Sequence, residues 1–187
     1  MTDERVLLSA FRFRIELTRS TSRSDGRPAE TGPGSPASGD ADGDDSRLGD
    51  GGFQECQGLE IELRVDAFEE GGRNDRVVQR MGRATFPPLV LKRGMLRPVG
   101  GPADRALWIW IQDVVTGVRP VRRYDGTVEV LDRTGEQVVA RWSFARGLPA
   151  KLVGPQLDGR TGEIAMEELH IAHEGLRMEE VSADARG

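Results

Sequence analysis

Residues 127–145 read TVEVLDRTGEQVVARWSFA and carry the strongest structural signal in the chain. Apolar and polar residues alternate through 127–131 and 136–145, while DRTG at 132–135 is a run of turn-forming residues. Alternation with a period of two is typical of a strand with one buried face, and two such strands around a short turn predict a β-hairpin. One face of the second strand, which we expect to turn toward a core, carries Val138, Ala140, Trp142 and Phe144.

Alternating stretches on both sides of this hairpin predict further strands. Strand character recurs at 11–18, 59–66, 84–92, 151–153 and 163–173. In the last of these stretches the alternation changes phase between Met166 and Leu169. This change predicts either a bulge in the strand or two ends that are covered on different faces.

One amphipathic helix is predicted between the start signals Pro102 and Asp104 and the stop signal Gly117. The residues spaced along one helical face, which we expect to pack on the sheet, are Leu107, Trp110, Ile111 and Val114. Several alternating strands with a single helix predict a mainly β fold. We therefore expect one domain over residues 1–187, a small antiparallel β-barrel or sandwich with one flanking α-helix.

Three segments outside these elements differ in composition. Residues 20–52 are rich in Gly, Ser and Asp, with Leu48 as the only large apolar residue. So few apolar side chains cannot bury enough surface to offset the conformational entropy that the backbone loses on ordering. We therefore expect a long disordered insertion between the first two strands. Residues 66–83 are charged, contain Gly-Gly and Asn-Asp turn signals, and predict an extended arm that leaves the body of the domain. Residues 177–187 are expected to form a flexible C-terminal tail.

Composition argues against several broad classes of protein. The 187 residues include 26 Lys and Arg against 31 Asp and Glu, and the net charge of -5 argues against a general nucleic-acid binder, which needs a basic surplus. No apolar run approaches the length of a transmembrane helix, and residues 1–14 lack the apolar block of a secretory signal. We therefore expect no membrane anchoring. The single cysteine, Cys56, excludes an internal disulfide framework.

Residues that could support metal binding or catalysis are scarce. The candidates are His170, His173, Cys56 and the acidic run Asp40, Asp42 and Asp44. Residues three apart in a strand lie on opposite faces, so the two histidines cannot readily share a metal ion. The acidic run resembles the start of a calcium-binding loop but lacks the Gly and the bidentate Glu that such a loop requires. We therefore predict no catalytic, cofactor-binding or metal site, and no enzymatic activity.

Seven phrases along the chain, taken in order, resemble one protein family. They are FRFRIEL (11–17), FQECQGLEIE (53–62), DAFEEGGRND (66–75), TFPPLVLKRG (85–94), LWIWIQDVVTG (107–117), VVARWSFARGLPAKLVGPQL (138–157) and EIAMEELHIAHEGL (163–176). Over residues 11–176, apart from the insertion, the chain is similar to the tail tube proteins of contractile phages and of phage-derived extracellular contractile injection systems. The resemblance implies a small antiparallel β-barrel with one helix on its flank, in agreement with the fold expected from the residues.

The resemblance also implies a structural role in the inner tube of an injection system or phage tail. Family members join their sheets edge to edge in hexameric rings and stack these rings through the arm. Contraction of the sheath then drives the tube through a target envelope. The implied partners are further copies of the chain and the sheath, baseplate and spike proteins, with the lumen open to cargo and no specificity for nucleic acid. The implied location is a particle that is assembled in the cytoplasm and can be released from the cell.

The same resemblance implies two sets of site residues. The arm that would reach the neighbouring ring includes Phe68, Glu69, Glu70, Arg73, Arg76 and Met81. Two charged faces are alternative candidates for the lumen: one carries Arg12, Arg14 and Glu16, and the other carries Glu60, Glu62 and Arg64.

Two alternatives remain open at the level of the sequence. Family members commonly join the first two strands by a short turn, whereas residues 20–52 intervene here. One alternative is therefore a paralogue that forms a tube-initiating ring next to the baseplate and spike. The alternative from another class is a lipocalin-like barrel that binds a small ligand. Such a barrel needs an apolar interior, while aromatic residues make up only 5% of this chain.

Overall fold

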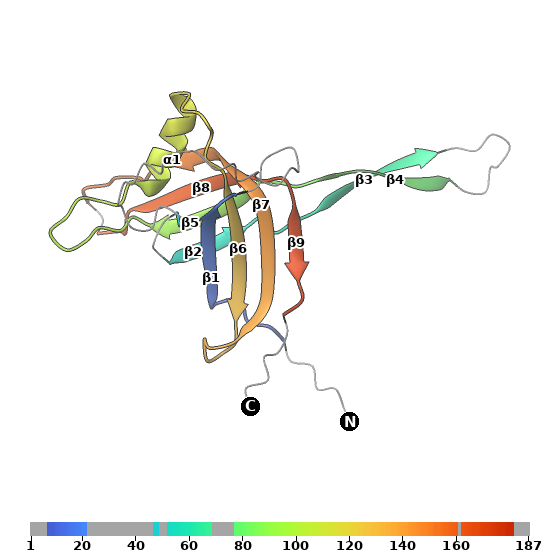
Figure 1. The fold of residues 1–187 in the computed structure, drawn as a ribbon. Helices are drawn as coiled ribbons and strands as arrows, with labels where there is room; N and C mark the ends of the chain where they lie inside the picture. The colour runs from blue at the N-terminus through green and yellow to red at the C-terminus, as the bar shows by residue number, and fades with distance from the viewer. Residues whose placement is uncertain (1–6, 22–46, 49–51, 69–76, 161, 182–187) are drawn as a thin grey trace, which may run out of the picture.

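The computed structural model describes residues 7–21, 47–48, 52–68, 77–160 and 162–181. In chain order its elements are β1 (Phe13–Arg19), β2 (Phe53–Gln57), β3 (Glu62–Phe68), β4 (Val78–Thr85), β5 (Leu89–Gly94), α1 (Ala106–Val115), β6 (Tyr124–Leu131), β7 (Val138–Val153), β8 (Met166–Ala172) and β9 (Leu176–Glu179). The fold is mainly β, its strands pair antiparallel, and the described part of the chain contains one helix (Figure 1). The predicted fold class is therefore confirmed.

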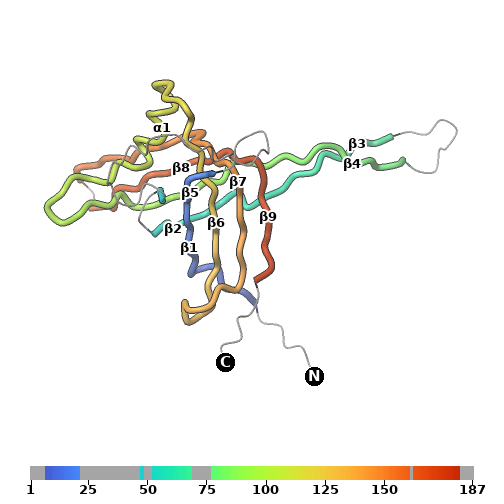
Figure 2. Tube along the Cα trace, viewed as in Figure 1, coloured from blue at the N-terminus to red at the C-terminus, as the bar shows by residue number. Residues whose placement is uncertain are grey.

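The long strand β7 joins the two layers of the body. It has 16 residues, of which the first part pairs with β6 on one side and β9 on the other, while the last part pairs with β8. We call β1, β6, β7 and β9 the β6 layer, and β2, β5, β8 and the end of β7 the β8 layer. The strands of the two layers cross at a wide angle (Figure 2). Residues 151–153, expected as a separate short strand, are instead the end of β7.

A bend at residues 146–147 carries β7 from one layer to the other. Arg146 has a φ of 56°, in the left-handed region, and its N–H donates a hydrogen bond of 2.7 Å to Asp125 Oδ1. At Gly147 a Cβ atom would lie 2.7 Å from Ile171 Cγ2 and 2.9 Å from Tyr124 O. Only a glycine fits this close approach, so the bend depends on residue 147 having no side chain.

The core lies between the two layers. Its buried apolar residues include Leu17, Leu89, Leu91, Tyr124, Phe144, Leu169 and Ile171. The ring of Phe144 fills the space over its cross-strand partner Gly126, where a Cβ atom would lie 2.2 Å from Phe144 Cε1. The packing of Phe144 therefore requires a glycine at residue 126 of β6.

Helix α1 packs against β7. Of the four residues predicted to pack, Leu107 and Trp110 are buried, whereas Ile111 and Val114 are half-buried. Trp110 Nε1 donates a hydrogen bond of 3.0 Å to Arg122 O, and the Trp110 ring meets Tyr124 edge-on with ring centroids 4.8 Å apart. Gly117, with a φ of 80°, follows the helix and allows the chain to turn away.

A buried ion pair ties the helix to the β8 layer. Arg93 of β5 and Glu167 of β8 are joined by an Nε–Oε1 contact of 2.6 Å. Arg93 Nη2 also contacts Asp104 Oδ2 at 2.9 Å, and Asp104 Oδ1 accepts a hydrogen bond from the N–H of Ala106, the first residue of α1. Trp108 Nε1 donates to Glu167 Oε2 at 3.2 Å. One buried network therefore holds two strands and the start of the helix together.

The same ion pair explains the change of phase that the sequence shows in residues 163–173. Strand β8 begins only at Met166, and its buried positions are Glu167, Leu169 and Ile171, a regular alternation. The register between β8 and β5 is also unbroken, and one face of β8 is buried along its length, so both expected explanations, a bulge or ends covered on different faces, are wrong. A carboxylate occupies a core position because a buried guanidinium pairs with it, and the pattern of apolar residues could not show this.

The stretch 59–66, expected to form one half-buried strand, belongs to two different parts of the fold. Leu59 follows the end of β2 at Gln57 and packs against the core of the body. Strand β3 then leaves the body and pairs only with β4, and all seven of its residues are exposed. The expectation of half-burial is therefore wrong, because the apolar face of this strand has no partner within the described chain.

Parts of the predicted insertion and of the predicted C-terminal tail lie among the described residues. Leu48 of the predicted insertion is buried, and its N–H donates a hydrogen bond of 2.9 Å to Leu17 O at the edge of β1. Residues 22–46 and 49–51, including the acidic run at 40–44, lie outside the described residues. The first three residues of the tail predicted at 177–187, Arg177 to Glu179, instead belong to β9 and pair with β7. Residues 182–187 lie outside the described residues.

Candidate functional site

The β3–β4 arm is a two-stranded ribbon that projects from the body (Figures 1 and 2). Its register runs from the Glu62–Thr85 pair near the body to the Phe68–Val78 pair at the outer end. The arm is thus longer than the predicted segment 66–83. A two-stranded ribbon is at best marginally stable in water, so an exposed one needs cover from another surface.

The two faces of the arm differ in chemistry. Leu63 and Val65 lie on one face, together with Met81, the partner of Val65, whose side chain is 83% exposed. On the opposite face, Arg64 Nε contacts Asp66 Oδ1 at 2.9 Å, and the Arg80 guanidinium lies 4.0 Å from the centroid of the Phe68 ring. We call Leu63, Val65 and Met81 the apolar strip. An apolar strip that protrudes in this way is typical of a protein-binding surface.

The structure separates the predicted arm residues. Phe68 and Met81 are both in the ribbon, but on opposite faces. The remaining four predicted arm residues, Glu69, Glu70, Arg73 and Arg76, lie outside the described residues.

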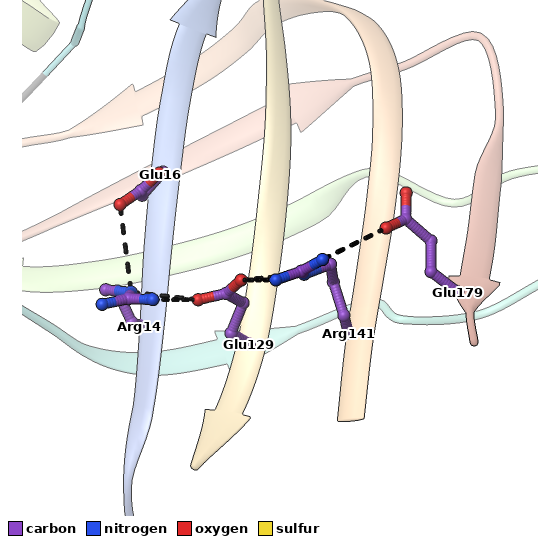
Figure 3. A network of polar contacts seen from close by, with 5 residues as sticks. All are labelled: Arg14, Glu16, Glu129, Arg141 and Glu179. Carbon is purple, nitrogen blue, oxygen red and sulfur yellow. Dashed lines mark hydrogen bonds and ion pairs between the residues drawn. The ribbon is translucent and has the colours of Figure 1, made fainter. Parts of the chain in front are cut away.

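A row of alternating charges crosses the outer face of the β6 layer (Figure 3). The row follows the strand register: Arg14 of β1 is opposite Glu129 of β6, which is opposite Arg141 of β7, which is opposite Glu179 of β9. Glu129 accepts hydrogen bonds from Arg14 Nε at 3.0 Å and from Arg141 Nε at 2.8 Å. Directly opposed charges of opposite sign stabilise a sheet, so this charge row holds the four strands in register.

Glu129 is the central and least exposed member of the charge row. Burial alone would raise the pKa of its carboxyl group, but the hydrogen bonds and charges of Arg14 and Arg141 outweigh burial, so the pKa of Glu129 is lowered. In turn, the hydrogen bond to Glu129 and the negative charge of Glu129 raise the pKa of Arg14. The carboxyl group of Glu129 is therefore ionised at neutral pH.

The predicted lumen residues fall into separate places. Arg14 and Glu16 lie in the outer face of β1, where Arg14 Nε is 3.9 Å from Glu16 Oε1. Arg12 precedes β1 and donates a hydrogen bond to Thr134 O. Glu60 lies between β2 and β3, while Glu62 and Arg64 are in the arm. The structure does not bring the two charged sets together.

Sequence reasoning missed Glu129 and Arg141 as partners of Arg14. The signal was present in the predicted hairpin, where residues 129 and 141 both alternate with apolar residues. Counting outward from the turn at 132–135 would instead pair Glu129 with Val138, because it misses the register shift between Val130 and Leu131 that brings Arg141 opposite Glu129.

The described residues carry little chemistry of other kinds. Nowhere in the described ranges do three His, Cys, Asp or Glu side chains gather in a way that could hold a metal ion. His170 contacts Glu168 at 2.6 Å, and His173 lies between the rings of Phe86 and Phe144. Burial raises the pKa of the Cys56 thiol to about 11, so the nucleophilic thiolate is scarce at neutral pH.

None of the described residues form a helix with the length and apolar character that crossing a bilayer requires.

The chain was compared with known families and structures. Residues 9–177 match the model of the family described as T4-like virus tail tube protein gp19. A search of curated proteins finds no match.

Solved structures share the fold at low sequence identity. A chain from the cap structure of the anti-feeding prophage, described as a tube-terminating cap, is 16% identical with a TM-score of 0.70, covering 97% of this chain and 96% of that one. A chain from the sheath–tube complex of the extracellular contractile injection system PVC is 17% identical with a TM-score of 0.67, covering 94% and 93%. A chain from the anti-feeding prophage baseplate is 19% identical with a TM-score of 0.64, covering 96% and 97%.

The family match begins before β1 and ends within β9, so it spans both layers, the arm and the helix. The three structures add that this same arrangement of strands recurs in assembled tube, cap and baseplate particles. This chain belongs to the family of the T4-like virus tail tube protein gp19.

Proposed function

We propose that the protein is a structural subunit of the inner tube of a contractile injection system or phage tail. Copies assemble into hexameric rings, the rings stack, and contraction of a surrounding sheath drives the finished tube through a target envelope. Its partners are further copies of itself and the sheath, baseplate and spike proteins. Assembly takes place in the cytoplasm, and the particle can be released. The role is structural rather than enzymatic.

The exposed arm is the observation that carries this proposal. The apolar strip lies on a ribbon that the body does not support, and burial of such a strip contributes roughly 25 cal/mol per Å² of apolar surface. A chain that functioned alone would expose this strip to water throughout its life. Contact with the next ring covers it, and in a stacked tube every copy makes the same contact.

The charge row suits the wall of a water-filled lumen. Arg14, Glu129 and Arg141 alternate in sign, so the face they form is hydrophilic without a strong net field. We therefore propose that the β6 layer faces the lumen. The second predicted set, Glu60, Glu62 and Arg64, lies at the base of the arm and in the arm itself, and we propose contacts between rings for that set.

The first test is the state of the purified protein. Negative-stain electron microscopy of the chain, expressed alone and together with its sheath protein, is expected to show rods or stacked rings of one diameter. Single rings that never stack would favour the tube-initiating paralogue. A folded chain that remains monomeric at high concentration, and beside the sheath, would contradict the proposal.

A further inference from the structure

The β6 layer ends in two edge strands that run in opposite directions. β1 is antiparallel to β6, β6 to β7, and β7 to β9, so β1 and β9 are antiparallel to each other. When copies are related by rotation about one axis, β9 of one copy meets β1 of the next in the antiparallel sense. The layer can therefore continue from copy to copy as a regular antiparallel sheet.

In each edge strand, every second residue turns its backbone N–H and C=O away from the layer, where a neighbouring strand could bind them. Leu17 O accepts a hydrogen bond from Leu48 N, which lies on the side of β1 that faces away from β6, so by the alternation of the ladder Ile15 also turns its N–H and C=O away from β6. On the other edge, Gly175 O bonds to Ala145 N of β7, so Met178, an odd number of residues later, turns its N–H and C=O outward. Ile15 and Met178 are thus available to form a hydrogen-bonded pair.

We propose that β9 of one copy pairs with β1 of the next in the register that places Met178 opposite Ile15. This proposal rests on the proposed function, because it specifies how the rings close. In this register Glu179 faces Arg14 and Arg177 faces Glu16, two pairs of opposite charge. The charge row then continues around the ring without interruption, since Glu179 ends the row in one copy and Arg14 begins it in the next.

The opposite face of the junction is also complementary. Met178 is 66% exposed in the isolated chain, and Ile15 packs only partly against the core. Both side chains lie on the core face of the layer: Ile15 alternates with the charged residues of β1, and Met178 is opposite Trp142, which packs against the core. The junction therefore buries an exposed methionine against a half-buried isoleucine.

Neighbouring registers are less favourable. A shift by one residue places a residue whose N–H and C=O point toward the new partner strand opposite one whose groups point away. It also places core-facing side chains of one strand beside charged side chains of the other. A shift by two residues places Arg177 opposite Arg14 in one direction and Glu179 opposite Glu16 in the other, and directly opposed like charges destabilise a sheet. Leu48 also occupies the edge at Leu17, so the new strand pair ends before that residue.

Cysteine cross-linking tests the register. In the Cys56→Ala background, Glu16→Cys with Arg177→Cys places one cysteine on each edge of the layer, at positions that the proposed register makes directly opposite. Such a non-hydrogen-bonded pair has Cα atoms about 4.5 Å apart, within the range for a disulfide. The two edges of one copy are separated by three strand spacings, about 14 Å, so any disulfide must join two copies. The control is Glu16→Cys with Glu179→Cys, which places the second cysteine on the same face of β9 but two residues away from the position opposite residue 16.

Oxidation of assembled rings of the Glu16→Cys/Arg177→Cys variant is expected to give a ladder of covalent oligomers that reductant reverses. The control variant is expected to give no such ladder. Rings that form normally but cross-link equally in both variants, or only in the control, would overturn the register and leave the proposed function intact. A wild-type chain that forms no rings would overturn both.

Discussion

Arg93 of β5 and Glu167 of β8 form an ion pair in which both side chains are about 1% exposed. Two charges at the centre of a small β fold are unusual, and their burial is tolerated because each has a partner. The pair also reaches the helix, through Asp104 and Trp108. It therefore governs both the stability of the subunit and the position of α1 on the β8 layer.

Removing one partner of this pair should strongly destabilise the subunit. Glu167→Leu leaves the Arg93 guanidinium buried opposite an apolar side chain, and we expect the free energy of unfolding to fall by about 3 kcal/mol or more. The double variant Arg93→Met/Glu167→Leu removes both charges and is expected to recover most of that loss. Urea denaturation of the three proteins measures the difference. A double variant no more stable than the single one would contradict this account.

The close approach of Gly126 and Phe144 predicts a second effect on stability. Gly126→Ala places a methyl group in the space of the Phe144 ring, so the ring must move within a packed core. We expect a loss of about 1–3 kcal/mol in the free energy of unfolding. Gly159→Ala is the matched control, because a Cβ atom there meets nothing within 4 Å. Equal stability of the two variants would show that the core near Phe144 is loosely packed.

Stability should depend on pH through Glu129. The pKa of this residue is lowered in the folded state, so its ion pairs contribute stability above the unfolded pKa of about 4.3 and lose it as the pH falls through the folded pKa. We expect the free energy of unfolding to fall more steeply below about pH 5 in the wild type than in Glu129→Gln. Glu163→Gln, at an exposed position, should follow the wild-type curve. Parallel curves for wild type and Glu129→Gln would refute this role.

The apolar strip predicts a separation of folding from stacking. Val65→Asp with Met81→Asp places charges on the strip, where they would have to be buried between rings, so we expect rods to be lost while single rings persist. The melting temperature of the subunit should change little, because both side chains are exposed in it. Val115→Asp, which places the same charge on an exposed apolar residue outside the arm, is the control and should form rods. Stacking that survives the double substitution would assign the contact between rings to another surface.

Much of the fold follows from local patterns. The hairpin at 127–145 and the helix near 106–115 are predicted because each buries one face against this chain's own core. The pattern fails at 59–66, where an alternating stretch is divided between the body and the arm, and at Glu167, where a charged residue lies in the core. In both places the pattern of apolar residues does not reveal the group that contacts the segment. For the arm this group is another surface, and for Glu167 it is Arg93.

The candidate surfaces are harder to predict than the fold. Arg14 is visibly a charged residue on the outer face of a strand, but its opposition to Glu129 depends on the pairing of β1 with β6, more than 100 residues later in the chain. Long-range register of this kind has no local signature in one sequence. The same limit applies to β9, whose four residues gain strand structure only by pairing with the middle of β7.

The central claim is that identical copies cover the surfaces that one chain leaves open. Hydrogen–deuterium exchange, compared between dissociated subunits and the assembled particle, tests it most directly. We predict that amides of β3, β4, β9 and the free edge of β1 gain strong protection on assembly, while amides of the buried strand β8 change little. An assembled particle in which the arm and both edges exchange as fast as in the free subunit would contradict the account.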